Sequence, residues 1–347
     1  MAGYIIKKPE VSVIILTYNR SHLLERAIQS ALNQSFNDFE IILINNGSTD
    51  DTEKILKKYQ HHKKIRTYSL EKNIGFVAGM NFAFDRLNGE WFCQLGDDDK
   101  INPNALSMLL GVVDQIDKNI NMVTCNGIDS ETNLLIGEGL KGDQILTLKE
   151  ILGKMSGNWW GITKTSLIDG HRFNEKLRWN VDVFWLKIHA TANHYYIHQP
   201  LLEWNTGNPH TETAMMRHAT IEENIEKFRE LIKEEEYWDI LSQYNPKKCI
   251  DGCLRGVLFM AIGSLSQEAL RYRKMIIQLS LPDITIRYLT WILIHTNPGL
   301  LKRIYLAFKG MIRFRCASQP KLTLRPQNIY NRHVNYIKRL SLEFQKQ

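Results

Sequence analysis

Hydrophobic and polar positions alternate in regular blocks along the first 125 residues of the chain. Short apolar runs bounded by polar residues predict buried strands, and apolar positions spaced by three and four residues predict amphipathic helices. The expected strands are 11–16, 39–44, 65–70, 91–95 and 122–125, and the expected helices are 21–33, 50–59, 75–87 and 102–116. This alternation is typical of an α/β fold with a mostly parallel sheet and helices on both faces.

Two of these helices begin with a recognisable capping pattern. Asp50 and Glu53 have the spacing of a capping box, so we expect them to begin the second helix. Asn102 followed by Pro103 predicts an N-cap and a first helical residue for the fourth helix.

The rest of the chain falls into two further parts. Residues 126–215 are mixed, with a hairpin expected around Asn133, helices at 147–155 and 181–192, and a strand at 195–204. From Ile221 onward the pattern is helical. We therefore expect three parts. They are the first half of an α/β domain (1–125), its second half (126–215) and a C-terminal helical region (216–347).

Composition places the chain among globular proteins, and its charge is unevenly distributed. Of 347 residues 44% are hydrophobic and 23% charged, which excludes disordered and coiled-coil classes. Residues 240–347 hold 18 Lys and Arg against 4 Asp and Glu, whereas residues 1–239 hold 26 against 33. A basic C-terminal region predicts an anionic partner, such as a membrane surface, a nucleic acid or an acidic substrate.

Neither a membrane span nor a zinc site is expected. The longest late uncharged run, 288–301, is 14 residues, and a spanning helix needs about 20 apolar ones. The N-terminus lacks the apolar core of a signal peptide. The five cysteines are scattered, and Cys249 and Cys253 have no second pair nearby, so we expect reduced thiols.

Polar residues follow three of the predicted strands. They are Thr17-Tyr-Asn-Arg20, Asn45-Asn-Gly-Ser-Thr-Asp50 and Gly96-Asp-Asp-Asp99. Ligands of parallel α/β sheets bind beyond the carboxyl ends of the strands, so these segments predict one site. Three consecutive carboxylates repel one another unless a cation binds, and Mg²⁺ or Mn²⁺ prefers such oxygens. A solvated acidic turn is the alternative.

The loop after the first strand excludes two common nucleotide sites. Neither G-x-G-x-x-G nor G-x4-G-K-[ST] is present there, so the dinucleotide and P-loop classes lack their fingerprints. A nucleotidyltransferase would also need a glycine-rich loop, and 17–21 contains no glycine.

Four ordered blocks together resemble glycosyltransferase family 2, whose members have the GT-A fold. They are Val11–Arg20, Phe39–Asp50, Asn73-Ile-Gly-Phe76 and Gly89–Asp99 with Pro103. The resemblance is strong over 1–125, fair to about 215 and weak beyond. It implies an inverting transfer of a sugar from a nucleotide-sugar to an acceptor hydroxyl.

The resemblance assigns residues to a nucleotide pocket. It implies that Thr17, Asn19, Arg20 and Asn73 line the pocket and that Asn46 contacts the base. The family commonly has Asp at position 46. Asn offers a donor and an acceptor to a uracil or thymine edge, so UDP or dTDP is expected.

The family's D-x-D motif falls on Gly96-Asp97-Asp98, with Gly replacing its first Asp. By resemblance Asp98 holds Mn²⁺ or Mg²⁺, while Asp97 faces the ribose or the metal. The metal would neutralise the diphosphate leaving group. His210 falls in a C-terminal loop that can reach the diphosphate or metal, although an isolated His is more often structural.

The resemblance also implies an acceptor side. Asp182 is the candidate general base, in an apolar cleft that would raise its pKa, although Val181 replaces the family's acidic or glycine residue. A helix N-cap is the alternative for Asp182. Trp159 and Trp160 could stack on sugar faces or pack in a core.

Taken together, these features predict a metal-dependent, non-processive glycosyltransferase of cell-surface polysaccharide or lipopolysaccharide biosynthesis. Its acceptor would be a glycan or a lipid-linked oligosaccharide. It would be cytoplasmic, with 240–347 docking on the inner face of the membrane. The alternatives are a degenerate, binding-only domain, because of Asn46, Gly96 and Val181, and a nucleic-acid-binding protein that uses the basic region.

Overall fold

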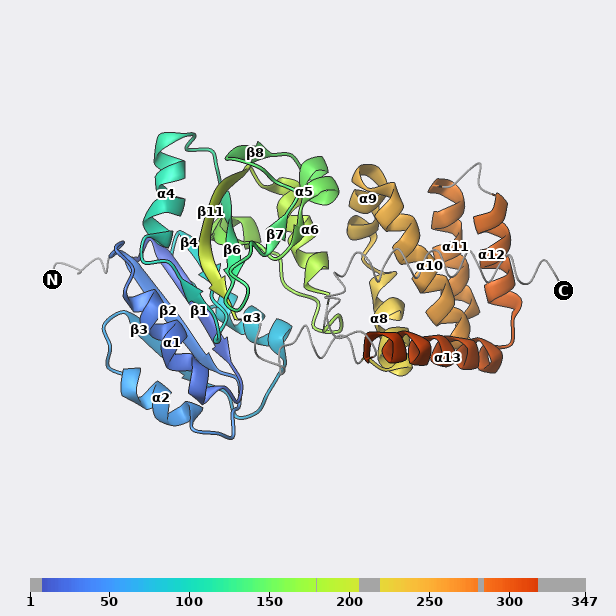
Figure 1. Cartoon of the computed structure of the whole chain (residues 1–347), viewed down its shortest axis with the longest axis horizontal. Helices are drawn as coiled ribbons and strands as arrows, with labels where there is room; N and C mark the ends of the chain where they lie inside the picture. The colour runs from blue at the N-terminus through green and yellow to red at the C-terminus, as the bar shows by residue number, and fades with distance from the viewer. Residues whose placement is uncertain (1–7, 179, 206–218, 280–283, 318–347) are drawn as a thin grey trace. The chain divides into compact units, whose positions relative to one another are not determined.

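The computed structural model describes residues 8–178, 180–205, 219–279 and 284–317. Side chains are described for these residues except at 284–285 and 308–317. The chain divides into two compact units, Met1–His218 and Ala219–Gln347. The first contains the sheet, and the second is helical wherever it is described as regular structure (Figure 1).

The first unit contains one large sheet with the order β3-β2-β1-β4-β10-β6-β11-β5, and β8 pairs with β11. Its strands are β1 (Val11–Thr17), β2 (Phe39–Asn45), β3 (Ile65–Ser69), β4 (Trp91–Gln94), β5 (Lys100–Ile101), β6 (Met122–Asp129), β8 (Gln144–Leu146), β10 (Trp160–Lys164) and β11 (His194–Trp204). Strands β1 to β4 are parallel to their neighbours among themselves, and β6 is parallel to β11. The predicted α/β fold with a mostly parallel sheet is therefore confirmed.

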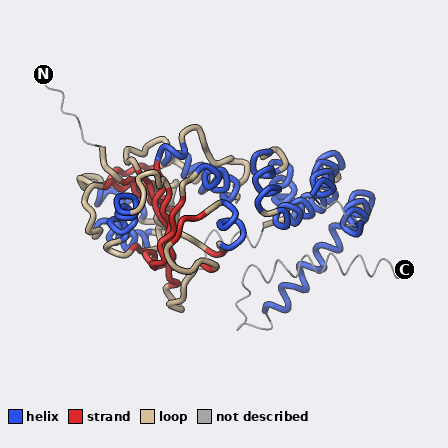
Figure 2. Tube along the Cα trace, turned by 90° about the horizontal axis from the view of Figure 1, so that it is seen from above, coloured by secondary structure: helices blue, strands red, loops and turns tan. Residues whose placement is uncertain are grey.

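Helices cover both faces of this sheet, as the tube in Figure 2 shows. They are α1 (Ser21–Leu32), α2 (Thr52–Tyr59), α3 (Phe76–Phe84), α4 (Ala105–Gln115), α5 (Leu148–Lys154) and α6 (Val181–Thr191), with a 3-10 turn at Thr165–Ile168. Successive side chains of a strand point to opposite faces. Val13 therefore packs in the core shared with α1, α2 and α4, and Ile14 in the core shared with α3 and α6.

Several strands were not expected, and β10 is the longest of them. Strand β10 lies antiparallel between β4 and β6, and the sequence predicted no strand at its position. A second small sheet pairs β7 (Gly137–Glu138) with β9 (Ser156–Gly157). Gly161 makes the close approach of β10 and β6 possible, because a Cβ there would lie 2.0 Å from the carbonyl oxygen of Val123.

Both predicted helix starts are displaced. Helix α2 begins at Thr52 and α4 at Ala105, so Asn102 and Pro103 precede α4 rather than begin it. Asp50 does not form the expected capping box with Glu53. Its Oδ1 accepts from the backbone N of Thr52 at 3.0 Å, and its Oδ2 accepts from the backbone N of Ser21 at 2.9 Å. Asp50 thus fixes the starts of two helices.

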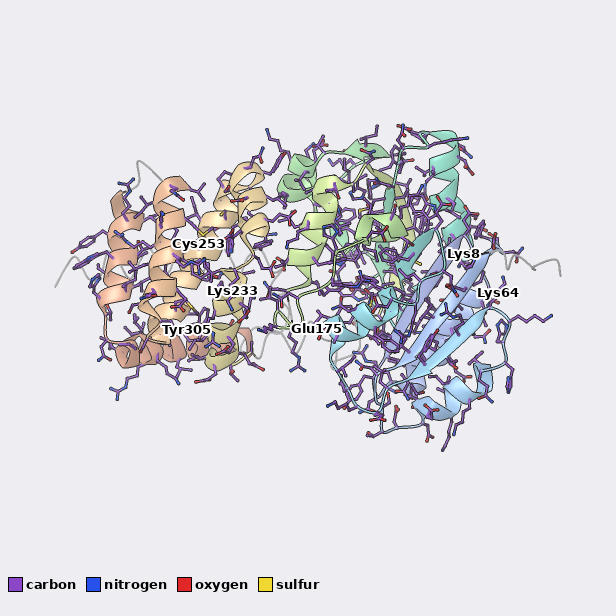
Figure 3. The ribbon with its side chains drawn as sticks, turned by 180° about the vertical axis from the view of Figure 1, so that it is seen from behind. Lys8, Lys64, Glu175, Lys233, Cys253 and Tyr305 are labelled. Atoms are coloured by element: carbon purple, nitrogen blue, oxygen red, sulfur yellow. The ribbon has the colours of Figure 1, made fainter. Side chains whose placement is uncertain are left out.

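The second unit consists of helices α8 (Ile221–Leu231), α9 (Glu235–Tyr244), α10 (Pro246–Ile262), α11 (Ser266–Leu279), α12 (Ile284–His295) and α13 (Pro298–Ala317). Helix α10 is central and contacts α8, α9, α11, α12 and α13. Gly256 of α10 permits this packing, because a Cβ there would lie 2.5 Å from the ring of Tyr272. Cys253, labelled in Figure 3, is a buried free thiol of the same helix.

Within the described ranges, no helix combines the length and the apolar composition that a membrane crossing requires. The described cysteine side chains are those of Cys93, Cys125, Cys249 and Cys253, and all four are buried free thiols.

Candidate active site

The three polar segments lie at the carboxyl ends of adjacent parallel strands, as predicted. Thr17 at the end of β1 pairs with Asn45 at the end of β2, and the backbone N of Asn46 donates to the carbonyl of Thr17 at 2.8 Å. The backbone N of Leu95 donates to the carbonyl of Ile14 at 2.8 Å, which places the Gly96–Asp99 turn beside β1. Backbone pairing therefore fixes these loops relative to one another.

Asp97, Asp98 and Asp99 form a buried acidic cluster, each less than 9% exposed. The Nη1 of Arg20 lies 2.6 Å from Oδ1 of Asp97 and 3.3 Å from Oδ2 of Asp98. Burial raises the pKa of Asp97, and the charge of Arg20 opposes that rise. Arg20 thus bridges two carboxylates that would otherwise repel each other.

Two further contacts of this cluster were not expected from the sequence. The guanidinium of Arg26 in α1 donates to the backbone carbonyl of Asp98. Oδ1 of Asp99 accepts from the backbone N of Asn205 at 2.9 Å. Burial raises the pKa of Asp99 to about 7, and the neighbouring Asp98 adds to that rise. No local sequence pattern predicts either contact, because both contacts join segments that are far apart in the sequence.

Asn19 joins the loop after β1 to the loop after β2. Its φ of 54° lies in the left-handed region, which Asn tolerates better than most residues. Its backbone N donates to Oγ of Ser48 at 2.9 Å, and its Oδ1 accepts from the backbone N of Thr49 at 2.7 Å. Asn19 therefore shapes the predicted pocket by holding its loops together.

The side chain of Asn46 forms hydrogen bonds with the 73–75 segment, whereas we expected it to contact a base. Its Nδ2 donates to Oδ1 of Asn73 and to the carbonyl of Gly75, both at 3.2 Å. Its Oδ1 accepts from the backbone N of Ile74 at 3.1 Å. The side chain is 3% exposed. Asn46 and the predicted pocket residue Asn73 are thus brought together, and they order one loop.

Asp182 lies in the first turn of α6 and is exposed to solvent. The apolar cleft that we expected around it is therefore wrong. A carboxylate in the first turn of a helix is favoured by the helix dipole. A role in proton transfer would have to rest on the position of Asp182 rather than on burial.

The two tryptophans of the expected acceptor loop have different environments. Trp160 begins β10, is 7% exposed, packs in the main core and donates from Nε1 to the carbonyl of Gln94 at 2.7 Å. Of the two alternatives that the sequence left open for Trp160, its burial favours core packing over sugar stacking. Trp159 is half-buried, with its ring 5.2 Å from that of Tyr196 and close against Gly137. His210 lies outside the described residues.

A family model described as "Glycosyl transferase family 2" matches residues 12–176. Residues 12–176 are a family 2 glycosyl transferase domain. This match covers a little under half of the chain. The matched range contains the loops after β1, β2 and β4 and ends before Asp182.

Curated relatives are similar to part of the chain. The chain is 34% identical over 197 residues to a GalNAc(5)-diNAcBac-PP-undecaprenol beta-1,3-glucosyltransferase of Campylobacter jejuni subsp. jejuni serotype O:2, covering 55% of this chain and 63% of the relative. It is 36% identical over 132 residues to a chondroitin synthase of Escherichia coli, covering 37% of this chain and 19% of the relative. The similarity thus spans less than two thirds of either relative.

Solved structures support the GT-A fold over a longer stretch. Residues 1–349 of S. aureus TarS in complex with UDP-GlcNAc superpose with a TM-score of 0.60, covering 82% of this chain and 87% of that chain at 18% identity. The same fragment in complex with UDP gives a TM-score of 0.55 over 80% of this chain and 90% of that chain, at 19% identity. At this identity the likeness shows a shared fold.

The acidic cluster fits a divalent cation that takes few protein ligands. Within the described ranges, no group of three or more His, Cys, Asp or Glu side chains is arranged to hold a metal ion. Mg²⁺ commonly uses one or two carboxylates and completes its shell with water and substrate phosphates. Asp97 and Asp98 supply such oxygens, and the cationic Arg20 already lies between them.

Proposed function

We propose that this glycosyltransferase moves a sugar, with inversion, from a UDP- or dTDP-sugar to a hydroxyl group of a glycan or lipid-linked acceptor. Transfer is non-processive and serves cell-surface polysaccharide or lipopolysaccharide synthesis. One observation carries the proposal: a buried acidic turn, bridged by Arg20, lies beside the loops after β1 and β2 in a family 2 domain. The Campylobacter relative is named for a diphosphoundecaprenol acceptor, and the TarS fragment was solved with UDP-GlcNAc.

The donor pocket is built from the ends of β1, β2 and β4. Asn19 and Arg20 line one side, and the exposed Asn73, held by Asn46, lines the other, while Thr17 at the end of β1 is only 1% exposed. Asp98, with Asp97 beside it, holds Mn²⁺ or Mg²⁺, which when bound neutralises charge on the diphosphate. Arg20 offers a second cationic group to the same phosphates. The proposed pocket thus combines hydrogen bonds to the nucleoside with positive charge at the leaving group.

Transfer itself is an in-line displacement at the anomeric carbon. The acceptor oxygen forms a bond to that carbon as the bond to the diphosphate oxygen breaks, and the electron pair leaves with the diphosphate. Asp182 accepts the proton of the attacking hydroxyl as general base. His210 is retained as a candidate phosphate or metal contact.

We assign acceptor binding to the second half of the domain, residues 126–215. Trp159 offers an aromatic surface there, because its ring is only partly covered by Tyr196 and Gly137. A lipid-linked acceptor is presented at a membrane, so we propose a cytoplasmic enzyme that associates peripherally with the inner leaflet through 240–347. This region holds 18 Lys and Arg but only 4 Asp and Glu, and this basic excess supports that association.

The first test is a Mn²⁺-dependent thermal shift against UDP, dTDP, GDP and CDP. We expect stabilisation by UDP or dTDP that needs both Mn²⁺ and Asp98. Asp98→Ala should abolish the shift, and Asp51→Ala should retain it, because Asp51 is an exposed carboxylate that forms a surface ion pair with Lys54. Stabilisation by no nucleotide would overturn the proposed function and favour the binding-only alternative. A salt-dependent gel shift would then identify nucleic-acid binding.

The second test separates transfer from donor binding. Asp182→Asn removes the basic oxygen but keeps the volume, so the nucleotide-induced thermal shift should persist while sugar transfer falls by at least about 100-fold. Transfer at the wild-type rate by this variant would exclude Asp182 as the base. Product stereochemistry, read by NMR of the anomeric proton, tests inversion independently.

A further inference from the structure

Helix α12 presents a ladder of stacked aromatic rings on the surface of the helical unit. The rings of Tyr288 and Trp291 are 6.1 Å apart and inclined by 13°, and those of Trp291 and His295 are 4.4 Å apart. Tyr288 is 57% exposed and Trp291 47% exposed. Nδ1 of His295 lies 2.8 Å from the carbonyl of Trp291, which fixes the last ring against the helix. Large aromatic side chains that are this exposed indicate a surface that is covered by something other than water, such as a lipid layer.

The composition of α12 also departs from that of an ordinary surface helix. Its only charged residue is Arg287, and Ile292, Leu293 and Ile294 are all partly exposed. A helix that is apolar on every side is normally buried or in a membrane. Twelve residues span only about 18 Å, which is too short to cross a bilayer. An apolar helix of this length, with Tyr and Trp at its surface, suits the interfacial layer of a membrane.

The charge around this helix selects the kind of membrane. Residues 283–307 contain Arg287, Lys302 and Arg303 against a single acidic residue, Asp283. Lys302 pairs with Glu222 at 2.9 Å, while Arg303 is exposed on α13. Leu300 and Leu306 of α13 are also about half exposed. Basic and apolar side chains together match an anionic lipid surface.

The same charges disfavour a second copy of the chain as the occupant. A two-fold contact through α12 would bring the Arg287 side chains of two copies toward one another, and α12 itself has no carboxylate to offset them. We infer that α12, through Tyr288 and Trp291, is the segment that docks the helical unit on an anionic phospholipid surface. This deepens the proposed function, because it names the contact that would bring the enzyme to a lipid-linked acceptor.

The test uses the full-length protein with vesicles and without nucleotide. In a flotation assay, the protein should float with phosphatidylcholine vesicles that contain phosphatidylglycerol at low salt. It should stay at the bottom of the gradient with phosphatidylcholine vesicles alone or at high salt. Replacing both Tyr288 and Trp291 by Ala should lower partitioning about tenfold, the value of burying two half-exposed rings. Tyr244→Ala is the matched control, since α9 and α12 lie at opposite ends of the row of helices (Figure 1) and Tyr244 is 37% exposed.

A second measurement does not depend on a disruptive variant. Brominated anionic lipids should quench part of the fluorescence of the eight tryptophans, and Trp291→Phe should remove that quenched part and leave the rest. Equal quenching in Trp291→Phe, unchanged flotation of the double variant, or no flotation of the wild type would overturn the inference. So would dimers or capture by an acidic protein that depend on Tyr288 and Trp291 without lipid binding. The nucleotide thermal shift reports separately on the proposed function.

Discussion

The Nη1 atom of Arg20 lies 2.6 Å from Oδ1 of Asp97, and this ion pair offsets negative charge in the acidic cluster. Asp97 is 4% exposed, so it needs a counter-charge to remain ionised. A guanidinium and a divalent cation would compete for the same oxygens. A cation held by Asp97 and Asp98 would therefore leave Arg20 free to contact the diphosphate.

Arg20→Gln tests this competition. Removing the cation from a buried carboxylate should lower the free energy of unfolding by about 3 kcal/mol. Mn²⁺ alone should then raise the Tm of the variant more than that of the wild type, because the ion replaces the missing charge. Arg172→Gln is the control, since its pair with Asp85 is exposed and contributes little. An equal Mn²⁺ effect in wild type and Arg20→Gln would show that the two cations do not share a site.

Asn46→Asp should damage the pocket, although Asp is the residue that the family commonly has there. The two Nδ2 donors of Asn46 face Oδ1 of Asn73 and the carbonyl of Gly75, both of which are acceptors. A carboxylate would lose both hydrogen bonds and repel both oxygens, costing about 2 kcal/mol. We expect a lower Tm and at least about tenfold weaker UDP binding by calorimetry. Asn119→Asp, at an exposed position, should change neither.

Gly96 explains how this chain departs from the D-x-D pattern. A Cβ at position 96 would lie 2.4 Å from Oδ2 of Asp99, so any side chain must displace that carboxylate. Asp99 would then lose its bond from the backbone N of Asn205. Gly96→Ala should destabilise the fold by about 1–2 kcal/mol and weaken metal-dependent nucleotide binding.

Gly153→Ala provides the matched control for that substitution. No atom lies within 4 Å of a Cβ at position 153, which is in helix α5. Ala should therefore be neutral or stabilise by up to about 1 kcal/mol. Unchanged nucleotide binding in Gly96→Ala would show that Asp99 has no part in the site.

Hydrophobic periodicity was enough to predict the fold of the first unit. The expected strands 11–16, 39–44 and 91–95 match β1, β2 and β4 closely, because each is a short apolar run with polar ends. Strand β10 was missed because Trp160–Lys164 carries Gly161 and alternates weakly, and its pairing partners lie 35 and more residues away. Antiparallel insertion is a tertiary property that local pattern does not encode.

The site could be predicted only as a set of loops. The location of 17–20, 45–50 and 96–99 at strand ends correctly predicted that these segments lie close together. It did not predict that Asn46 turns its amide toward 73–75, or that Trp160 faces the core. Residue type leaves the direction of a side chain open, because an amide or an indole serves equally well in a pocket or in packing.

The histidine pair of α6 and β11 should make the fold sensitive to acid. The rings of His189 and His194 are buried and stacked, with centroids 5.2 Å apart. Nε2 of His194 lies 2.8 Å from Oγ1 of Thr124, and neither Nδ1 has a hydrogen-bond partner within the described part of the chain. Burial lowers the pKa of His189 from 6.5 to about 4 and that of His194 well below 6.5.

Because both native imidazoles resist protonation, the unfolded chain binds more protons below about pH 6.5, and stability falls as the pH falls toward 4. His189 alone should lower the free energy of unfolding by about 2 kcal/mol between pH 7 and pH 5. Urea unfolding at these two values should show this loss, and His189→Phe, which keeps an aromatic ring in the same space, should remove about half of the total. His61→Gln, at an exposed position, should leave the pH dependence unchanged. A pH dependence equal to that of the wild type in His189→Phe would mean that other groups cause the acid sensitivity.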